Sequence, residues 1–172
     1  APGRVVLEAR QGTNRPTNQK RLGGLPTLLT RRHTFDDRSI TWHTLEGSEH
    51  LQYHIFAVDE VKKIVDVMFK FASNKKVVLH RHHADYVTLV VQGELRIYRA
   101  NGELKEVRPV GSYVATKVGG EPHTEGGGDE DAVVFFSNRG QDGVIYEILD
   151  EQMNTLATLG LLDFKGLLQA QT

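Results

Sequence analysis

Apolar and polar residues alternate along much of this chain, starting near residue 39. In the stretch 64–71, Val65, Val67 and Phe69 fall on one side of an extended chain, and Asp66 and Lys70 fall on the other. Successive side chains of a β-strand point to opposite faces of the sheet, so a period of two predicts a strand with one buried face. The same pattern predicts strands at 39–45, 51–58, 64–71, 77–82, 87–91, 95–99, 104–107, 112–116, 132–137 and 144–149.

Short segments rich in glycine, asparagine, serine and proline separate these stretches. Asn101-Gly102 is the strongest hairpin signal, because tight hairpin turns need residues that tolerate a positive φ. The glycine run 126–128 precedes three acidic residues and lacks the lysine of a phosphate-binding loop, so we interpret it as a flexible hairpin. Many short strands at close spacing are typical of an all-β sandwich or barrel.

The two ends of the chain differ from this pattern. Residues 10–24 are polar and show no period, which predicts an extended arm. Near the other end, Asp163 precedes Phe164, Leu167 and Leu168, a spacing that predicts a short C-terminal helix with Asp163 as its N-cap. We therefore expect an N-terminal arm and lead-in segment over residues 1–38 and one domain over residues 39–172.

Composition narrows the range of partners. Lysine and arginine (21) nearly balance aspartate and glutamate (22), so we expect neither a nucleic acid nor an anionic membrane as a partner. No apolar run approaches the roughly 20 residues of a membrane helix, and residues 1–20 lack the apolar core of a secretory signal. Cysteine is absent, which excludes thiolate ligands. We expect a cytoplasmic protein that binds a small molecule.

Histidines supply the most specific chemical signal. His80 and His82 alternate at the end of the predicted strand 77–82, so both project from one face and can reach the same metal ion. His123 follows the strand 112–116 and a turn, and is the third candidate ligand. Three imidazoles suit iron, copper, nickel or zinc and leave coordination positions open. His83 is expected to point outward, and His33, His43, His50 and His54 are not expected to bind metal.

The spacing of these residues resembles the cupin superfamily. His80, His82 and Gly93 fit its first motif, and Gly111, Gly119 or Gly120, and His123 fit its second motif. The resemblance covers residues 77–136 and implies a single jelly-roll barrel, also called a double-stranded β-helix, with a metal held inside it.

One position departs from the family pattern. Tyr86 stands where many cupins carry a ligating glutamate, and strand register favours Tyr86 as the inward residue. The sequence therefore leaves the identity of a fourth protein ligand undecided. Tyr86 itself occupies the position, and Asp85 could turn inward through a bulge. A carboxylate could also come from Glu94, Glu121 or Glu125.

A three-histidine cupin is similar to acetylacetone-cleaving and 2,4'-dihydroxyacetophenone dioxygenases. That resemblance implies Fe(II), dioxygen and cleavage of a carbon–carbon bond beside a carbonyl in a small β-dicarbonyl or aryl ketone. Three neutral imidazoles would leave the full charge of a divalent ion to attract an enolate. Tyr86 is the candidate for orienting the substrate; a core aromatic residue is the alternative reading.

The sequence is also compatible with two other functions, and it leaves the identity of the metal and the oligomeric state undecided. A non-catalytic zinc sensor resembling the cupin domain of anti-sigma factors would use the segment 153–172 as its partner surface. A metal-dependent isomerase or lyase would turn over without oxygen. Zinc, nickel and manganese are alternatives to iron. We expect a homodimer, because exposed sheet edges need covering.

Overall fold

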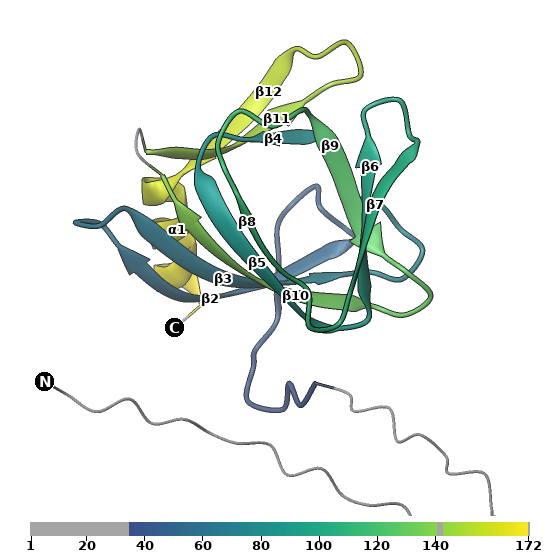
Figure 1. Cartoon of the computed structure of the whole chain (residues 1–172). Helices are drawn as coiled ribbons and strands as arrows, with labels where there is room; N and C mark the ends of the chain where they lie inside the picture. The colour runs from purple at the N-terminus through teal and green to yellow at the C-terminus, as the bar shows by residue number, and fades with distance from the viewer. Residues whose placement is uncertain (1–34, 141–142, 172) are drawn as a thin grey trace, which may run out of the picture. The chain divides into compact units, whose positions relative to one another are not determined.

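The computed structural model describes residues 35–140 and 143–171. Within these ranges the chain forms twelve β-strands and one α-helix (Figure 1). The elements are β1 (His43–Thr44), β2 (Leu51–Asp59), β3 (Ile64–Phe71), β4 (His80–His82), β5 (Asp85–Gln92), β6 (Glu94–Arg99), β7 (Leu104–Pro109), β8 (Tyr113–Thr116), β9 (His123–Gly127), β10 (Ala132–Arg139), β11 (Val144–Leu149), β12 (Thr155–Gly160) and α1 (Leu161–Ala170). The predicted all-β class with a short C-terminal helix is confirmed. The predicted arm at 10–24 and His33 lie outside the described residues.

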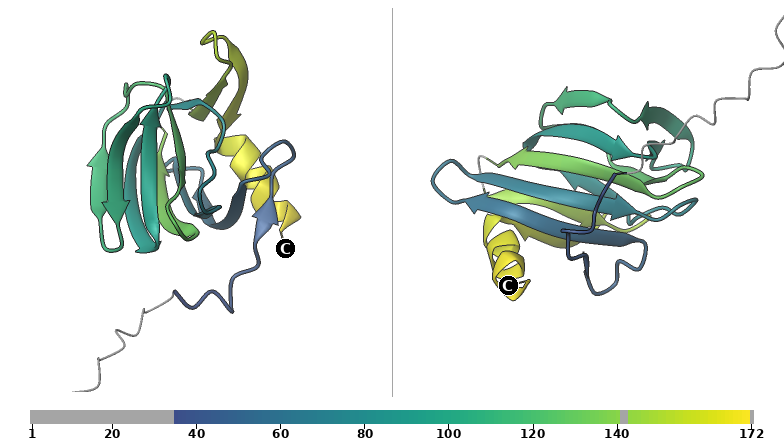
Figure 2. Two further views of the ribbon diagram at one scale, coloured as in Figure 1. Left: turned by 90° about the vertical axis from the view of Figure 1, so that its right-hand side faces the viewer. Right: turned by 90° about the horizontal axis from the view of Figure 1, so that it is seen from below.

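The strands form two six-stranded sheets that face each other. One sheet has the order β1-β2-β3-β10-β5-β8 and the other β12-β11-β4-β9-β6-β7, with antiparallel pairing between neighbours. Figures 1 and 2 show the two sheets curving around a shared interior, with α1 on the flank beside β2 and β12. This arrangement is the jelly-roll barrel that the sequence predicted.

The core lies between the sheets and follows the alternation seen in the sequence. In β3 the side chains of Val65, Val67, Phe69 and Phe71 are buried, and Phe136 of β10 packs against the last two. Fully burying a side chain of this size stabilises the fold by roughly 1.5–3 kcal/mol. The interior is therefore apolar except where β4, β5, β7, β9 and β10 bring polar residues into it.

Two predicted strands are shorter than the sequence pattern suggested. Of 39–45 only His43–Thr44 pairs, with β2, and of 77–82 only His80–His82 is a strand. In the second case β3 belongs to one sheet and β4 to the other, so the chain between them crosses over. Residues 77–79 reach the second sheet through isolated hydrogen bonds, from Val77 N–H to the Glu125 oxygen and from Leu149 N–H to the Leu79 oxygen. The apolar residues 77–79 therefore lead into the strand that carries the histidines without belonging to it.

The prediction that the glycine run 126–128 forms a flexible hairpin was wrong for its first two residues. Gly126 and Gly127 lie inside β9, paired with β6. A Cβ on Gly126 would overlap the backbone oxygen of Lys75, and one on Gly127 would lie 2.9 Å from the backbone oxygen of Ala72. The crossover between β3 and β4 passes so close to β9 that a larger residue would collide with its backbone.

The C-terminal region contains a further correction. Helix α1 begins at Leu161, with Gly160 as N-cap, and the predicted cap Asp163 lies two residues inside the helix. Its carboxylate accepts a hydrogen bond from the backbone N–H of Gly160 at 2.7 Å, which satisfies a free donor at the helix start. The preceding strand β12 was not predicted, because most of its residues are exposed and show no apolar alternation. In the part of the chain that is described, no helix is long and apolar enough to cross a membrane.

Candidate metal centre

Strand β4 places His80 and His82 on the inside of the barrel. Both side chains are buried, while Arg81 between them points outward and pairs with Glu147 on β11 at 3.1 Å. Their imidazole rings lie 5.1 Å apart, centre to centre. The alternation of inward and outward side chains that the sequence predicted is therefore present in the structure. His83 lies on the outside, 2.7 Å from the Glu147 carboxylate.

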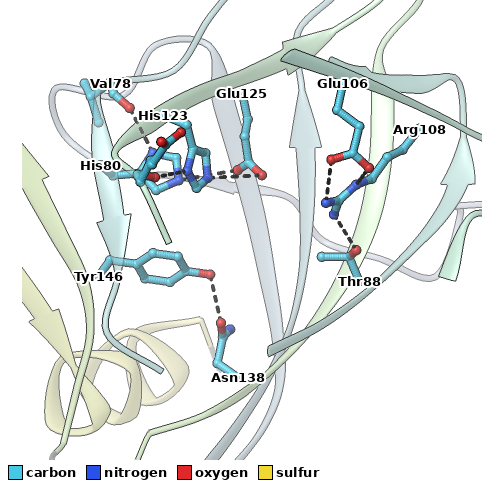
Figure 3. A network of polar contacts seen from close by, with 10 residues as sticks. Val78, His80, Thr88, Glu106, Arg108, His123, Glu125, Asn138 and Tyr146 are labelled. Atoms are coloured by element: carbon cyan, nitrogen blue, oxygen red, sulfur yellow. Dashed lines mark hydrogen bonds and ion pairs between the residues drawn. The ribbon is translucent and has the colours of Figure 1, made fainter. Parts of the chain in front are cut away.

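Strand β9 brings the other half of the site. His123 pairs directly with His80 across the β4–β9 ladder, and their rings lie 4.7 Å apart. Glu125 follows two residues later, so its side chain projects from the same face as His123. The carboxylate of Glu125 lies 3.5 Å from Nε2 of His80 and 3.9 Å from Nε2 of His123 (Figure 3).

Backbone carbonyls orient two of the imidazoles. Nδ1 of His80 lies 3.0 Å from the Val78 oxygen and Nδ1 of His123 lies 2.9 Å from the Glu121 oxygen, so in each ring Nδ1–H can donate and Nε2 is left with its lone pair (Figure 3). Among the described residues, none gives a hydrogen-bond partner to Nε2 of His123 or to either nitrogen of His82. Buried polar atoms are normally paired, so three unpartnered imidazole nitrogens in one place indicate a missing electrophile.

Electrostatics favour the protonation states that a metal requires. Burial would raise the pKa of Glu125, but its hydrogen bond with His80 and the charges of the imidazoles outweigh burial and lower the pKa to about 2. Burial and the neighbouring His80 lower the pKa of His82, and burial also lowers the pKa of His123. His80 is the exception: burial opposes its charge, yet the contact with Glu125 raises its pKa. In that pair a divalent ion would take the place of the shared proton.

The donor set fits a divalent metal ion. One ligand atom from each of His80, His82, His123 and Glu125 lies within 4.8 Å of all the others, and all four residues are buried. Imidazole and carboxylate together suit iron, zinc, nickel or manganese, so these four residues would hold the ion and leave its identity open.

The structure shows which of the candidate carboxylates from the sequence lie near the histidines. Asp85 points outward and forms an ion pair with Lys117 at 2.7 Å. Glu94 pairs with Arg96 at 2.6 Å, and Glu121 lies on the surface. Glu125 alone of these carboxylates lies with the histidines among the described residues. From the sequence we expected three neutral ligands that leave the full charge of the ion; an ionised Glu125 in the ligand set would lower the net charge of a loaded site by one.

Tyr86 lies inside the barrel, as register predicted. Its ring stacks on the imidazole of His82 with centres 3.9 Å apart and an angle of 22° between the planes. Burial and the charge of Glu125 raise the pKa of Tyr86 to about 12, so the phenol keeps its proton at neutral pH. This stacking restrains the orientation of His82.

Two further polar groups inside the barrel were not identified from the sequence. The hydroxyl of Tyr146 donates to Asn138 Oδ1 at 3.2 Å, and its ring lies edge-on to His82 at 4.9 Å. Arg108 is buried, makes two hydrogen bonds to Glu106 at 2.8 and 3.0 Å, and donates to the hydroxyl of Thr88 at 3.1 Å (Figure 3). The first network joins β10 to β11 and the second joins β5 to β7, and in each case the two strands belong to different sheets, so the alternation within one strand carries no signal for them.

A pocket opens onto the His80 side of the site. Apolar side chains from both sheets and the helix form most of it, among them Phe69, Phe71 and Phe164. His80 and Glu125 also line it. The centres of water molecules could occupy a volume of about 60 Å³ inside it. We call this space the inner pocket. An apolar lining that ends at a few polar groups is the usual form of a small-molecule site.

The fold and the buried ligand set define the class of this protein: the chain has the cupin fold, with a site that fits a cupin metal centre. It resembles the crystal structure of an RmlC-like cupin protein from Ralstonia eutropha JMP134, with a TM-score of 0.65 and 18% identity over 79% of this chain and 83% of the other. It also resembles a protein of unknown function with a cupin-like fold from the same organism, with a TM-score of 0.63 and 16% identity over 80% and 82% of the two chains.

An enzyme is also among the similar structures. The acetylacetone dioxygenase from Acinetobacter johnsonii matches with a TM-score of 0.62 and 12% identity, over 91% of this chain and 98% of that one. Identities this low establish the shared fold and leave the reaction open. The sequence matches no protein-family model and no curated protein.

Proposed function

We propose that this protein is a non-haem Fe(II) dioxygenase that cleaves a carbon–carbon bond in a small β-dicarbonyl or aryl ketone. The observation that carries the proposal is the buried group His80, His82, His123 and Glu125 at the end of an apolar pocket. The proposal is supported by the fold that this chain shares with a solved acetylacetone dioxygenase.

The chain's own residues divide the work. His80, His82, His123 and Glu125 would hold the ion, and the Val78 and Glu121 carbonyls keep two of the imidazoles in the ligating tautomer. When bound, Fe(II) supplies a Lewis acid for an enolate and electrons for dioxygen. The apolar walls of the inner pocket exclude water from the reacting carbonyl.

Tyr86 is proposed to orient the substrate. Its phenol is protonated at neutral pH and can therefore donate a hydrogen bond to a carbonyl oxygen. Since its ring is stacked on His82, a shift of Tyr86 would also move that ligand. The proposed role thus needs a variant that keeps the ring and removes only the hydroxyl.

Oxygen consumption tests the proposal. Cleavage places one oxygen atom on each carbon of the broken bond, so one dioxygen should disappear per ketone and acidic products should form. The protein would be purified anaerobically without chelator, loaded with Fe(II) and given a panel of β-dicarbonyls and aryl ketones. Uptake with one class, absent in His123→Ala, is the expected result. Uptake at background for the whole panel would contradict it.

One observation favours a second candidate. Four protein ligands can close a tetrahedral zinc site, and structural zinc sites have this coordination number. A zinc-holding sensor of the kind considered from the sequence would retain zinc through dialysis and show no turnover. Turnover that continues without oxygen would instead favour a metal-dependent isomerase or lyase.

A further inference from the structure

A second pocket adjoins the inner pocket on the outside of the barrel. It is lined by residues 47–51 and 76–78, and the centres of water molecules could occupy a volume of about 190 Å³ inside it. We call it the outer pocket. Four residues line both pockets: Ser48, Leu51, Val77 and Val78. The two spaces therefore follow one another, from the surface between the loop before β2 and the crossover before β4 to His80 and Glu125.

We propose that the outer and inner pockets form the route by which a ligand reaches the metal centre, and that this route selects uncharged ligands against carboxylates. The proposal rests on the proposed function only in taking His80, His82, His123 and Glu125 as the metal-holding residues.

The size of the inner pocket limits what can pass. About 10–15 Å³ of this kind of space holds one water molecule, so the inner pocket has room for roughly four to six waters. A ligand of a few carbon atoms fits this space. A bulkier tail would have to extend into the outer pocket.

The charges along the route give the selectivity. Of the described residues that line the inner pocket, none is a lysine or an arginine, and Glu125 places a buried carboxylate at its end. The charge of Glu125 would be offset by the ion it holds, and that ion takes the head of the ligand. A carboxylate on the tail of the ligand would lose its hydration between apolar walls without meeting a cationic side chain, whereas an uncharged tail avoids this cost.

The lysine of the outer pocket does not alter this conclusion. The ammonium of Lys76 lies 3.8 Å from the centre of the Tyr98 ring and donates to the Gly102 oxygen at 3.4 Å. These contacts hold its charge over β6 and the β6–β7 turn. Glu49 in the same pocket adds a further negative group.

Val78 is the position where the selectivity can be reversed. Its side chain is 42% exposed and lines both pockets, while its backbone oxygen is fixed by the His80 ring. A lysine there would put an ammonium on the route without removing any ligand or any core side chain. Ser48, on the loop before β2, offers the same test from another segment.

The test uses two β-diketones with identical heads, one with an isobutyl tail and one with a carboxymethyl tail of the same shape. Their affinities would be measured by calorimetry on the Zn(II)-loaded protein, with metal content checked before and after. Because the heads are the same, the ratio of the two affinities reports the surroundings of the tail. Zinc carries out no dioxygen chemistry, so the measurement does not depend on turnover.

Wild type should bind the isobutyl compound at least about tenfold more tightly, and Val78→Lys should reduce that ratio about tenfold. Ser48→Lys should shift it the same way. Val61→Lys, at a 93% exposed position in the β2–β3 turn, is the matched control and should leave the ratio unchanged. A wild-type preference for the carboxylate, no binding of either compound, or a ratio that neither variant at 48 nor 78 changes would overturn the route. A selective route in a protein that consumes no dioxygen would reject only the proposed reaction.

Discussion

The two sides of the histidine cluster differ in how the barrel interior is filled. On the His80 side an apolar pocket leads to the ligand atoms, and its walls come from both sheets and α1. On the His82 side the Tyr86 ring lies against the imidazole at 3.9 Å. Beyond it, Arg108 is tied to Glu106 and Thr88 by hydrogen bonds.

This difference indicates that one side admits ligands and that the other side holds the imidazoles in position. Open apolar space can admit and desolvate a ligand, whereas a stacked ring and a buried, hydrogen-bonded guanidinium position the groups around them. Arg108 is paired with the partly exposed Glu106 on its own strand, and its hydrogen bond to Thr88 joins β7 to β5. We interpret the His80 side as the side from which ligands enter and the His82 side as the support that keeps the imidazoles aligned; from that side the Tyr86 hydroxyl would meet a substrate only at the metal itself.

The largest expected effect comes from removing a ligand that both sides share. His123→Ala should weaken metal binding at least about a hundredfold, since even residues that only orient ligands contribute 10–100-fold. Metal per chain, and competition with a chelator, would measure the loss. His83→Ala is the matched control, because His83 lies on the outer face beside Glu147. Equal metal in both variants would place the ion elsewhere.

Arg108→Met tests whether the His82 side is structural. Removing one partner of a buried ion pair costs about 3–5 kcal/mol, and because Glu106 is partly exposed we expect about 2 kcal/mol from urea unfolding of the metal-free protein. Metal content should change little. The double variant Arg108→Met, Glu106→Gln should recover part of the lost stability. Normal stability with lost metal would assign Arg108 to the metal centre.

Glu125→Gln keeps the shape of the side chain and removes its charge. If Glu125 is the fourth ligand, metal affinity should fall about 10–100-fold, a smaller loss than for His123→Ala. Glu121→Gln, at an exposed carboxylate two residues before His123, controls for a general change in charge. Chelator competition on both variants measures the difference. Unchanged affinity in Glu125→Gln would restore a centre held by three histidines alone.

Tyr86→Phe should retain the ring stacked on His82 and therefore the metal. If the phenol donates to a substrate, kcat/KM for the ketone should fall about tenfold, the value of one hydrogen bond. The two readouts together distinguish substrate orientation from packing. An unchanged kcat/KM with normal metal content would make Tyr86 a supporting aromatic residue only.

The smallest effect concerns the pH dependence of the metal-free protein. The lowered pKa values of His82 and His123 mean that the unfolded chain binds protons near pH 6.5 that the folded chain does not, so their contribution to stability falls as pH drops through 6.5. The raised pKa of His80 acts in the opposite direction: its contribution is present below pH 6.5 and is lost as pH rises through the folded value.

Because two imidazoles oppose one, we expect a net decrease of the urea midpoint between pH 7 and pH 5 in metal-free protein. His82→Leu should make this decrease smaller. A midpoint that rises on acidification would contradict the signs assigned to these groups.

Much of the site follows from local rules, and one residue shows where they stop. The pair His80 and His82 shares a face because strands alternate, and the inward position of Tyr86 follows from the same rule. Glu125 obeys that rule too, two residues after His123. From the sequence Glu125 was only one of several candidate carboxylates, because the adjacent glycines read as a turn, and only the close crossover at Lys75 explains why glycine stands in a strand.

The sequence by itself determined the all-β class, the alternation that fills the core and the shared face of His80 and His82, because each depends on neighbours within a few residues; His123 was identified by the resemblance of its motif. The tertiary structure alone decided that His123 faces His80 across a ladder, that Glu125 lies with the three histidines, and that residues between 45 and 164 line one pocket. Those features depend on which strands become neighbours, and strand order is set by the packing of the whole barrel, which no local pattern of residues encodes.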